Sequence, residues 1–524
     1  MHTSPATVLS WLLAFSPIAT VLILMIGFRR GGHQAGPVGW AVAMIVAWSF
    51  FGAGKEVLFY SQVRGVWLSL YVLYIIWMAL VLYRVVDEAG AIAAIGQGIT
   101  RLTSEPTMQL LLLAWVFAAF LQGVAGFGVP IAVVAPLLIG LEFTPVVAVA
   151  AVAIGHSWSV TFGDMASSFQ ALMAATNLPG KLLAPWSALS LGVACLGNGI
   201  AVAWMYHQET ALRRGWPALL LIGAAMASIQ LGLAVSGLWN LAGFGAGLAG
   251  LLMGALVTRL PRYQSQTARV PHAPDKRTEV SSPLPLGFAL APYLLLIGVV
   301  AAAELWPWLH EELNRVQIQV QVPEVQTRYG WTTDAGPSRA ISLFGHAGSL
   351  LAYVSVITYF FYQRTGRYPS GAAQRIVRRT LQSAMPASIG IFSMVGMATA
   401  MDHSGMIDVL ARGLGQVAGP LYPLTAPFIG LLGAFMTGSN TNSNVVFAPL
   451  QQQTAILLGI NVPVILAAQT TGGSLGSMLA PAKIILGCST AGLVGREGEV
   501  LKKTLPPGLI LSGIIGILTL LASR

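Results

Sequence analysis

Apolar runs of about membrane-spanning length follow one another along the whole chain, and they constrain its fold more than any other feature. The hydrocarbon core of a bilayer is about 30 Å thick, so a helix needs about 20 apolar residues to cross it. Segments of that kind lie at 7–28, 37–54, 66–86, 144–163, 181–206, 217–236, 238–258, 285–304, 341–361, 381–402, 462–485 and 506–522. Only 9% of the 524 residues are charged, whereas a soluble domain has roughly 25%. The sequence therefore predicts an all-α polytopic membrane protein with about 12 transmembrane helices.

Two further apolar stretches, 108–140 and 422–459, are interrupted near their midpoints. The first is interrupted by Gly123-Val-Ala-Gly-Phe-Gly-Val-Pro130 and the second by Gly438-Ser-Asn-Thr-Asn-Ser-Asn444. Each arm is short for a complete span, and irregular backbone at membrane depth is tolerated only where protein buries it or it lines an aqueous cavity. We therefore predict two re-entrant hairpins, each of which enters and leaves the membrane on the same side.

The distribution of basic residues predicts how these elements are oriented. If Arg29 and Arg30 face the cytoplasm, 19 of the 28 Lys and Arg residues fall on cytoplasmic segments, 8 fall on the opposite side, and Lys483 lies within a span. Cytoplasmic loops of membrane proteins carry such an excess. Both termini then lie outside, and the first apolar run, which lacks a basic segment before it, is a retained span. The net charge of +10 follows from this topology, so we expect no nucleic-acid partner.

The same orientation makes the two hairpins parts of two inverted repeats. Ala119-Phe120-x-x-Gly123 matches Ala434-Phe435-x-x-Gly438, and each hairpin is followed by a proline-started span that breaks partway. The predicted division is N-terminal scaffold helices (1–86), a first repeat (87–258) with its broken span at 144–163, a cytoplasmic linker (259–284), further scaffold helices (285–380) and a second repeat (381–524) with its broken span at 462–485.

One long external segment, 305–340, separates two of the scaffold spans. Residues 316–322 alternate strictly between apolar and polar types, which predicts a small β-hairpin outside the membrane. A structural cap is the favoured interpretation of this segment, with a substrate funnel as the alternative.

The two hairpin tips and the two broken spans predict where a small anion would bind. The spans break at Gly155–Asp164 and Thr470–Lys483, where Gly, Ser, Thr and Pro interrupt the apolar pattern. Helix N-termini exposed at such breaks carry partial positive charge and unpaired N–H groups, which suit a carboxylate. The alternative role of the polar tip residues is to satisfy the hairpin's own backbone. The candidate substrate-binding residues are Gly126, Phe127, Gly128, Ser157, Ser159, Ser439, Asn440, Thr441, Asn442, Ser443, Asn444, Thr471, Gly472, Gly473, Ser474 and Lys483.

Ionisable residues are scarce within the apolar segments, so each needs an explanation. His156 and Asp164 lie in the first broken span and are candidates for carrying a proton. Lys483 is a candidate partner for a substrate carboxylate or for Asp164. The alternative is an internal ion pair or a position at the membrane surface. The two cysteines, Cys195 and Cys488, lie in or beside apolar segments, so the sequence predicts no disulfide framework, no metal site and no cofactor.

The motifs at 123–130, 155–164 and 438–444 together resemble those of the L-lactate permease family, in order and length over most of the chain. The resemblance implies import of L-lactate, D-lactate or glycolate with a proton across a bacterial cytoplasmic (inner) membrane. It also implies kinship with the broader ion transporter superfamily, in which paired hairpins move against a dimeric scaffold. Elevator-type alternating access and a homodimer are expected from that analogy alone.

Energetics give an independent reason to expect proton coupling. Moving a monoanion inward against an inside-negative potential costs about 2.3 kcal/mol per 100 mV, and one co-transported proton removes that cost. Sodium would serve equally well, and the hydroxyls, amides and single Asp of the breaks favour the proton only weakly.

The remaining alternatives are a sodium- or proton-coupled carrier of another organic anion such as a dicarboxylate, an anion channel, and an enzyme that uses His156 and Asp164. We expect no enzyme, because no nucleophile or metal partner accompanies that pair.

Overall fold

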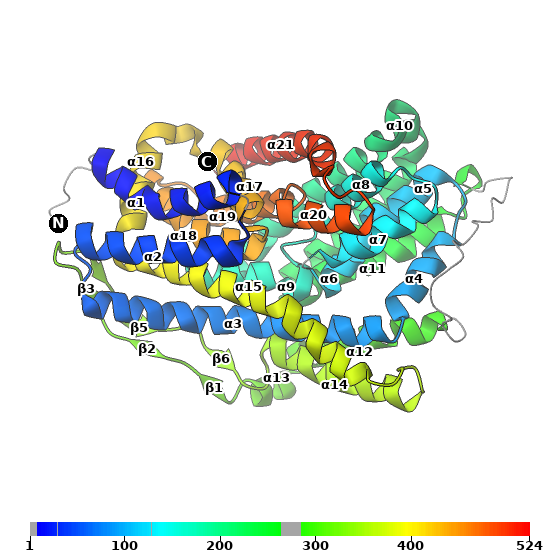
Figure 1. The fold of residues 1–524 in the computed structure, drawn as a ribbon, viewed down its shortest axis with the longest axis horizontal. Coiled ribbons are helices and arrows are strands. Elements are labelled where there is room, and N and C mark those ends of the chain that lie inside the picture. The colour runs from blue at the N-terminus through cyan, green and yellow to red at the C-terminus, as the bar shows by residue number, and fades with distance from the viewer. Residues whose placement is uncertain (1–7, 29, 127, 264–283, 524) are drawn as a thin grey trace.

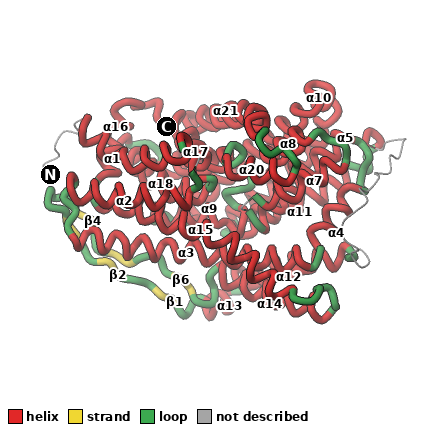
Figure 2. The backbone as a smooth tube through the Cα atoms, viewed as in Figure 1, coloured by secondary structure: helices red, strands yellow, loops and turns green. Residues whose placement is uncertain are grey.

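The computed structural model describes residues 8–28, 30–126, 128–263 and 284–523. Figure 1 shows helices packed side by side, many of them along the longest axis of the molecule. Figure 2 shows that strands are confined to short pieces at one edge of this helical body. The chain is therefore an all-α polytopic membrane protein, as its apolar runs predict.

The N-terminal part and the first half of the chain contain α1 (Val8–Leu22), the π-helical turn η1 (Ile23–Gly27), α2 (Gly32–Phe50), α3 (Lys55–Glu88), α4 (Ala91–Thr100), α5 (Pro106–Leu110), the π-helical η2 (Leu111–Phe117), α6 (Ala118–Val124), α7 (Val129–Gly140), α8 (Pro145–Ser157), α9 (Gly163–Thr176), α10 (Gly180–Val235), α11 (Trp239–Val257) and the 3₁₀ turn η3 (Pro261–Tyr263). The predicted linker, 259–284, lies mostly outside the described residues.

The second half contains α12 (Leu286–Leu305), α13 (Pro307–Leu313), six short strands, α14 (Ala347–Arg364), α15 (Ala372–His403), α16 (Met406–Ala418), the 3₁₀ turn η4 (Gly419–Leu421), α17 (Tyr422–Thr437), α18 (Asn440–Leu458), α19 (Val462–Gly476), α20 (Pro481–Thr490) and α21 (Glu497–Ala522). The strands are β1 (Gln317–Ile318), β2 (Gln321–Val322), β3 (Val325–Gln326), β4 (Thr332–Thr333), β5 (Gly336–Pro337) and β6 (Ile341–Ser342).

Ten helical stretches of the described chain are long and apolar enough to cross a membrane, so the figure of about 12 spans stays a prediction. Two of the predicted spans, 181–206 and 217–236, form the single long helix α10, whose backbone departs from helical geometry at Gln208, where φ is +46°. The predicted spans 144–163 and 462–485 are each replaced by two short helices, α8 with α9 and α19 with α20. The predicted breaks in these spans are therefore present.

Both interrupted apolar stretches fold as pairs of helices joined by a short turn. In the first, residues 125–128 separate α6 from α7, and in the second, Gly438 and Ser439 separate α17 from α18. We call these turns the first tip, which is described at residues 125, 126 and 128, and the second tip (438–439). The two arms of each pair contact one another. Each tip uses a left-handed glycine, Gly128 with φ +86° and Gly438 with φ +70°, a conformation that disfavours other residues. Re-entry from one membrane face stays a prediction.

The long helices α3 and α15 pack against each other, and α15 also packs against α2 (Figure 1). Each of the two long helices is followed by a short helix, α4 or α16, that is not among the predicted spans. In α4 the apolar residues Ile92, Ile95 and Ile99 are buried at the spacing of one helical face. The two halves thus share one order of elements: a long helix, a short helix, a hairpin and a broken span.

The external segment forms the β-hairpin that its alternation predicts. Its six strands pair antiparallel as β1 with β6, β2 with β5, and β3 with β4, so the chain reverses between Gln326 and Thr332. The strands β2 and β3 lie against α3. The hairpin is therefore docked on the helical body along that helix.

Candidate functional site

The second tip begins helix α18 with its own hydroxyl caps. The Ser439 hydroxyl accepts a hydrogen bond from the Asn442 backbone N–H at 3.4 Å, as an N-cap residue does. The Thr437 hydroxyl donates to the Ser439 carbonyl at 2.9 Å. Two polar residues at this tip therefore satisfy the hairpin's own backbone, which is the alternative role that the sequence allows for them. The start of α18, with its partial positive charge, lies at the second tip.

Asn440 joins the second tip to both broken spans. Its amide Nδ2 donates to the Thr161 hydroxyl at 3.0 Å and to the Thr470 carbonyl at 3.2 Å. Thr161 lies in the turn between α8 and α9, and its backbone N–H donates to the hydroxyl of Ser474 in α19 at 2.9 Å. The structure thus brings together the second tip, the first broken span and the second broken span, as the repeat pattern predicts.

Asn444, one turn further along α18, makes a second connection of the same kind. Its Nδ2 donates to the Ser168 carbonyl and to the Thr470 hydroxyl, both at 2.9 Å. The Thr441 and Ser168 hydroxyls lie 3.0 Å apart and share a hydrogen bond. Ser443 faces the other way, because its hydroxyl donates to the Gly430 carbonyl in α17 at 2.8 Å. Ser443 therefore stabilises the hairpin, whereas Asn444 and Thr441 contact α9.

The orientations of the Asn440 and Asn444 amides are fixed by these partners. Backbone carbonyls only accept hydrogen bonds, so the amide nitrogen must face them and Oδ1 must face away. The Oδ1 atoms of Asn440, Asn442 and Asn444 and the hydroxyl of Thr471 are buried without a hydrogen-bond partner among the described residues. Buried acceptors without a donor cost roughly 1–3 kcal/mol each. The second tip therefore has an unmet demand for hydrogen-bond donors.

The first tip is held by Asp164. The Gly126 backbone N–H donates to the Asp164 carboxylate, and Asp164 is 6% exposed. The residues Asp164, Met165 and Ala166 have φ of 49°, 53° and 60°, which is uncommon for residues other than glycine. A Cβ at Gly126 would lie 2.8 Å from Gln122 Nε2 and against the Asp164 carboxylate. Gln122 and Asp164 therefore occupy the side of Gly126 on which a side chain would stand. Phe127 lies outside the described residues.

His156 lies in the last turn of α8 and is fully buried. Its Nδ1 lies 2.6 Å from the Val152 carbonyl, which requires a proton on Nδ1 and leaves Nε2 as the acceptor in the neutral ring. Nε2 has no hydrogen-bond partner in the described part of the chain. The geometry therefore leaves Nε2 of a buried imidazole without a hydrogen-bond partner among the described residues.

Three other predicted site residues point elsewhere. The Ser157 hydroxyl accepts from Asn198 Nδ2 in α10 at 2.8 Å, and the Ser159 hydroxyl donates to the His156 carbonyl at 2.8 Å. Gly472 lies against the backbone of Pro427 in α17, with the carbonyl carbon 2.6 Å from the place of a Cβ. These residues support local structure and helix packing. Gly473 differs, because a Cβ there would meet the Asn440 amide.

A cavity of about 400 Å³ lies between the second tip and the helices α2, α3 and α15. We call it the tip cavity. Ser439, Asn442 and Lys483 line it, and so do His33 and Arg84 from the facing helices. Its described lining contains no Asp or Glu. The cavity is therefore suited by charge to an anion.

The two strong cations of the tip cavity, Lys483 and Arg84, have few protein partners among the described residues. The Lys483 ammonium donates to the Ser477 hydroxyl and forms no ion pair with Asp164 or any other described residue within 4.0 Å. Arg84 donates to the Ser383 hydroxyl at 3.1 Å and lies 3.9 Å from the Asp87 carboxylate. Of the two partners predicted for Lys483, the Asp164 pairing is thus absent from the structure.

Sequence reasoning missed several residues of this region. Thr161 and Thr470 lie inside the two breaks that the sequence identifies, so their hydroxyls could have been selected by residue type. Arg84 lies near the end of the predicted span 66–86, and the sequence pattern does not distinguish it from the basic residues that flank other spans. Ser168 belongs to α9, which continues beyond the predicted end of its span.

Comparisons with known proteins identify the family of this chain. A family model described as L-lactate permease matches residues 10–524. "Glycolate permease GlcA" of Escherichia coli (strain K12) is 27% identical over 541 residues, which cover 98% of this chain and 95% of that protein. "L-lactate permease" of Bacillus subtilis (strain 168) is 26% identical over 544 residues, which cover 98% of this chain and 96% of that protein.

A solved structure, "Crystal structure of the Alcanivorax borkumensis YdaH transporter reveals an unusual topology", aligns with 89% of this chain and 87% of that chain at 17% identity and a TM-score of 0.45. That likeness is too loose to transfer residues. The match of the family model over nearly the whole length carries the assignment. This multi-pass membrane protein therefore belongs to the L-lactate permease family.

Proposed function

We propose that this chain is a secondary active transporter that imports a small 2-hydroxy monocarboxylate, L-lactate together with D-lactate or glycolate, by proton symport. Relatives that cover nearly the whole chain are named glycolate permease and L-lactate permease. The observation that carries the proposal is the tip cavity, where Lys483 and Arg84 line one space without a carboxylate in its described lining. A small carboxylate is the ligand that such a lining attracts.

The polar groups of the tip cavity match both ends of a 2-hydroxy acid. The carboxylate would accept from the Lys483 ammonium and from backbone N–H groups at the start of α18. The substrate hydroxyl would donate to Asn442 Oδ1, which is buried without another partner among the described residues. A volume of about 400 Å³ lies within the range of pockets that hold small ligands. A dicarboxylate would have to place its second carboxylate at Arg84, the other strong cation of the described lining.

His156 and Asp164 are the proposed proton carriers. Both are buried, the His156 ring has an unpartnered Nε2, and Asp164 holds the first tip through Gly126. A change in the protonation of Asp164 would therefore alter a contact at the tip itself. Coupling of this kind joins the proton to the movement of the hairpin, which symport requires.

Alternating access of the elevator type is part of the proposal. The hairpin helix α18 lines the tip cavity with Asn442, and it lines a second cavity with Val445 and Pro449. Both cavities share α3 and α15 as the facing wall. A hairpin that slides along this wall would expose its tip first to one cavity and then to the other. We expect a homodimer in a bacterial inner membrane, with the two scaffolds in contact.

The test is uptake of labelled L-lactate by proteoliposomes under an inward proton gradient and without sodium, with unlabelled glycolate and succinate as competitors. We expect accumulation that a protonophore abolishes and that glycolate, but not succinate, blocks. Uptake that requires sodium, or competition by succinate alone, would establish the alternative carrier of another organic anion. Flux that equilibrates without accumulation under the gradient would indicate a channel.

A further inference from the structure

Two adjoining cavities lie beneath the β-hairpin, at the end of α3 opposite to Arg84. Their volumes are about 310 Å³ and 680 Å³. Both are lined by Arg64, Trp331, Arg339 and Asp402, so we treat them as one vestibule. The smaller cavity reaches Val445 in α18, the residue after Asn444. The vestibule therefore extends from the β-hairpin to the second hairpin of the proposed transport unit.

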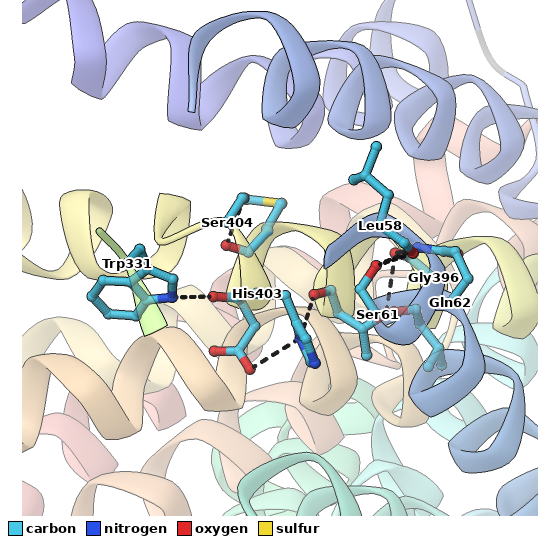
Figure 3. Close-up of polar contacts among 11 residues, drawn as sticks. Leu58, Ser61, Gln62, Trp331, Gly396, His403 and Ser404 are labelled. Carbon is cyan, nitrogen blue, oxygen red and sulfur yellow. Dashed lines mark hydrogen bonds and ion pairs between the residues drawn. The ribbon is translucent and has the colours of Figure 1, made fainter. Parts of the chain in front are cut away.

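The β-hairpin is fixed over this vestibule at two points. The indole N–H of Trp331 donates to the Asp402 carbonyl at the end of α15, at 3.1 Å. Figure 3 shows Trp331 reaching toward that helix end, next to His403. On the other side, the Trp67 indole N–H donates to the Arg339 carbonyl at 2.7 Å. The hairpin is thus a wall attached to both long helices, which holds Arg339 in position opposite α3.

The guanidinium groups of two arginines in the vestibule have N–H donors without a hydrogen-bond partner among the described residues. Within the described ranges, neither Arg64 nor Arg339 has a carboxylate within 4.0 Å or a side-chain hydrogen bond. The Arg339 guanidinium lies over the ring of Tyr71, 5.0 Å from its centre. Such stacking uses the face of the group and leaves the N–H donors in its plane available. Those donors form the fork that matches a carboxylate.

Three acidic residues, Asp334, Asp402 and Asp408, also line the vestibule and limit the strength of anion binding, but none of them lies within 4.0 Å of Arg64 or Arg339. Asp408 is already paired with Arg412 at 2.7 Å. The Asp402 carboxylate lies 3.9 Å from the ring nitrogen of His403, and its side chain is 49% exposed. Weak binding suits a site through which a solute passes, because the solute must also leave.

We propose that this vestibule is a second anion site, in which Arg64 and Arg339 bind a small carboxylate before it reaches the hairpin. The choice of carboxylate as the ligand rests on the proposed function. On the predicted topology the vestibule faces outside. Arg64 and Arg84 belong to the same helix α3, about 30 Å apart along its axis at 1.5 Å per residue. The scaffold then presents one arginine to the solute at each of the two cavities.

Protection of the arginines from chemical modification tests the site without depending on transport. The purified protein is treated with phenylglyoxal in L-lactate or in chloride of equal ionic strength, and the modified arginines are quantified by peptide mass spectrometry. Arg328, an exposed arginine of the same β-hairpin that lies outside the vestibule, is the internal control. Modification of Arg64 and Arg339 should slow about threefold at a lactate concentration of twice the dissociation constant, since the rate falls as 1 + [L]/Kd.

The outcomes separate this inference from the proposed function. Equal rates in lactate and chloride at Arg64 and Arg339, or equal slowing at Arg328, would overturn the vestibule site. Protection in a protein that fails to take up lactate would keep the anion site and reject the transport proposal.

Uptake kinetics provide the second readout. Arg64→Gln should raise KM about tenfold, the order expected for the loss of one charge-assisted interaction. The rate of uptake at saturating substrate should change little. Arg64→Lys should restore part of the loss, and Arg328→Gln should leave KM unchanged. A KM of Arg64→Gln equal to that of Arg328→Gln would contradict the proposal.

Discussion

Replacing Gly472 with alanine tests whether this residue binds substrate, as the sequence predicts, or lets two helices touch. A Cβ at Gly472 would lie 2.6 Å from the carbonyl carbon and 2.7 Å from the Cα of Pro427. Carbon atoms in contact prefer 3.5–4.0 Å, so α19 would have to move about 1 Å away from α17. A Cβ at Gly430 of α17 would likewise meet the backbone of α19, 2.9 Å from the Gly473 nitrogen. Both contacts involve backbone atoms, so rotation of a side chain would not relieve either of them.

The expected cost follows from this rigidity. Overpacking a well-packed interior typically lowers the free energy of unfolding by 1–3 kcal/mol. Because the Cβ would meet backbone atoms, which cannot rotate away, we expect a loss of about 3 kcal/mol for Gly472→Ala. We therefore expect a fall of several degrees in the thermal unfolding midpoint of the detergent-solubilised protein. Protein that remains folded should transport with an unchanged KM.

Gly298→Ala is the matched control for this substitution. Gly298 is also helical, in α12, and a Cβ there would meet nothing within 4 Å. Its replacement should change the free energy of unfolding by less than about 1 kcal/mol, in the stabilising direction, because alanine favours the helix over glycine. A raised KM in Gly472→Ala together with a wild-type unfolding midpoint would refute the packing argument and return Gly472 to the substrate site.

Three further predictions address the tips. Asn442→Ala should raise the KM for lactate without loss of protein from the membrane, and should remove any preference for lactate over propionate, which lacks the hydroxyl donor; unchanged kinetics would exclude this residue from the site. His156→Ala and Asp164→Asn should reduce gradient-driven accumulation more than equilibrium exchange, and normal accumulation in both would exclude them as proton carriers. Asn440→Ala and Thr161→Val should show a coupling energy of about 0.5–3 kcal/mol in unfolding, whereas additive effects would contradict their hydrogen bond.

The helical breaks were predictable because they depend on local chemistry. Gly438 and the polar residues after it interrupt an apolar run. The hydropathy of the sequence therefore locates the break without any knowledge of how the helices pack. The short helices α4 and α16 were missed for a related reason. They have 10 and 13 residues, too few for a span, and only the burial of one face against other helices stabilises them.

The partners of the site residues were harder to predict because they depend on tertiary packing. The bond between Thr161 and Ser474 joins residues 313 positions apart, and a sequence pattern contains no direct sign of it. Ser157 was selected by residue type, but its hydroxyl faces Asn198, since the direction of a side chain is set by the helix phase after packing. The meeting of the two broken spans agrees with the prediction of inverted repeats, in which equivalent elements converge near a common axis, and the inversion itself stays a prediction.

The unpartnered acceptors at the second tip are the strongest reason to regard it as a binding site instead of a structural turn. If the tip residues served only to satisfy the hairpin's own backbone, each polar side chain would have a backbone partner, as the Ser439 hydroxyl has. The amide nitrogens of Asn440 and Asn444 are held by backbone carbonyls, so their oxygens cannot exchange places with them to find a donor. The unpartnered Oδ1 atoms of Asn440, Asn442 and Asn444 therefore represent a cost that the described contacts do not offset. At Asn442, which lines the tip cavity together with Lys483, we propose that a ligand supplies the missing donor through its hydroxyl and a carboxylate for the ammonium.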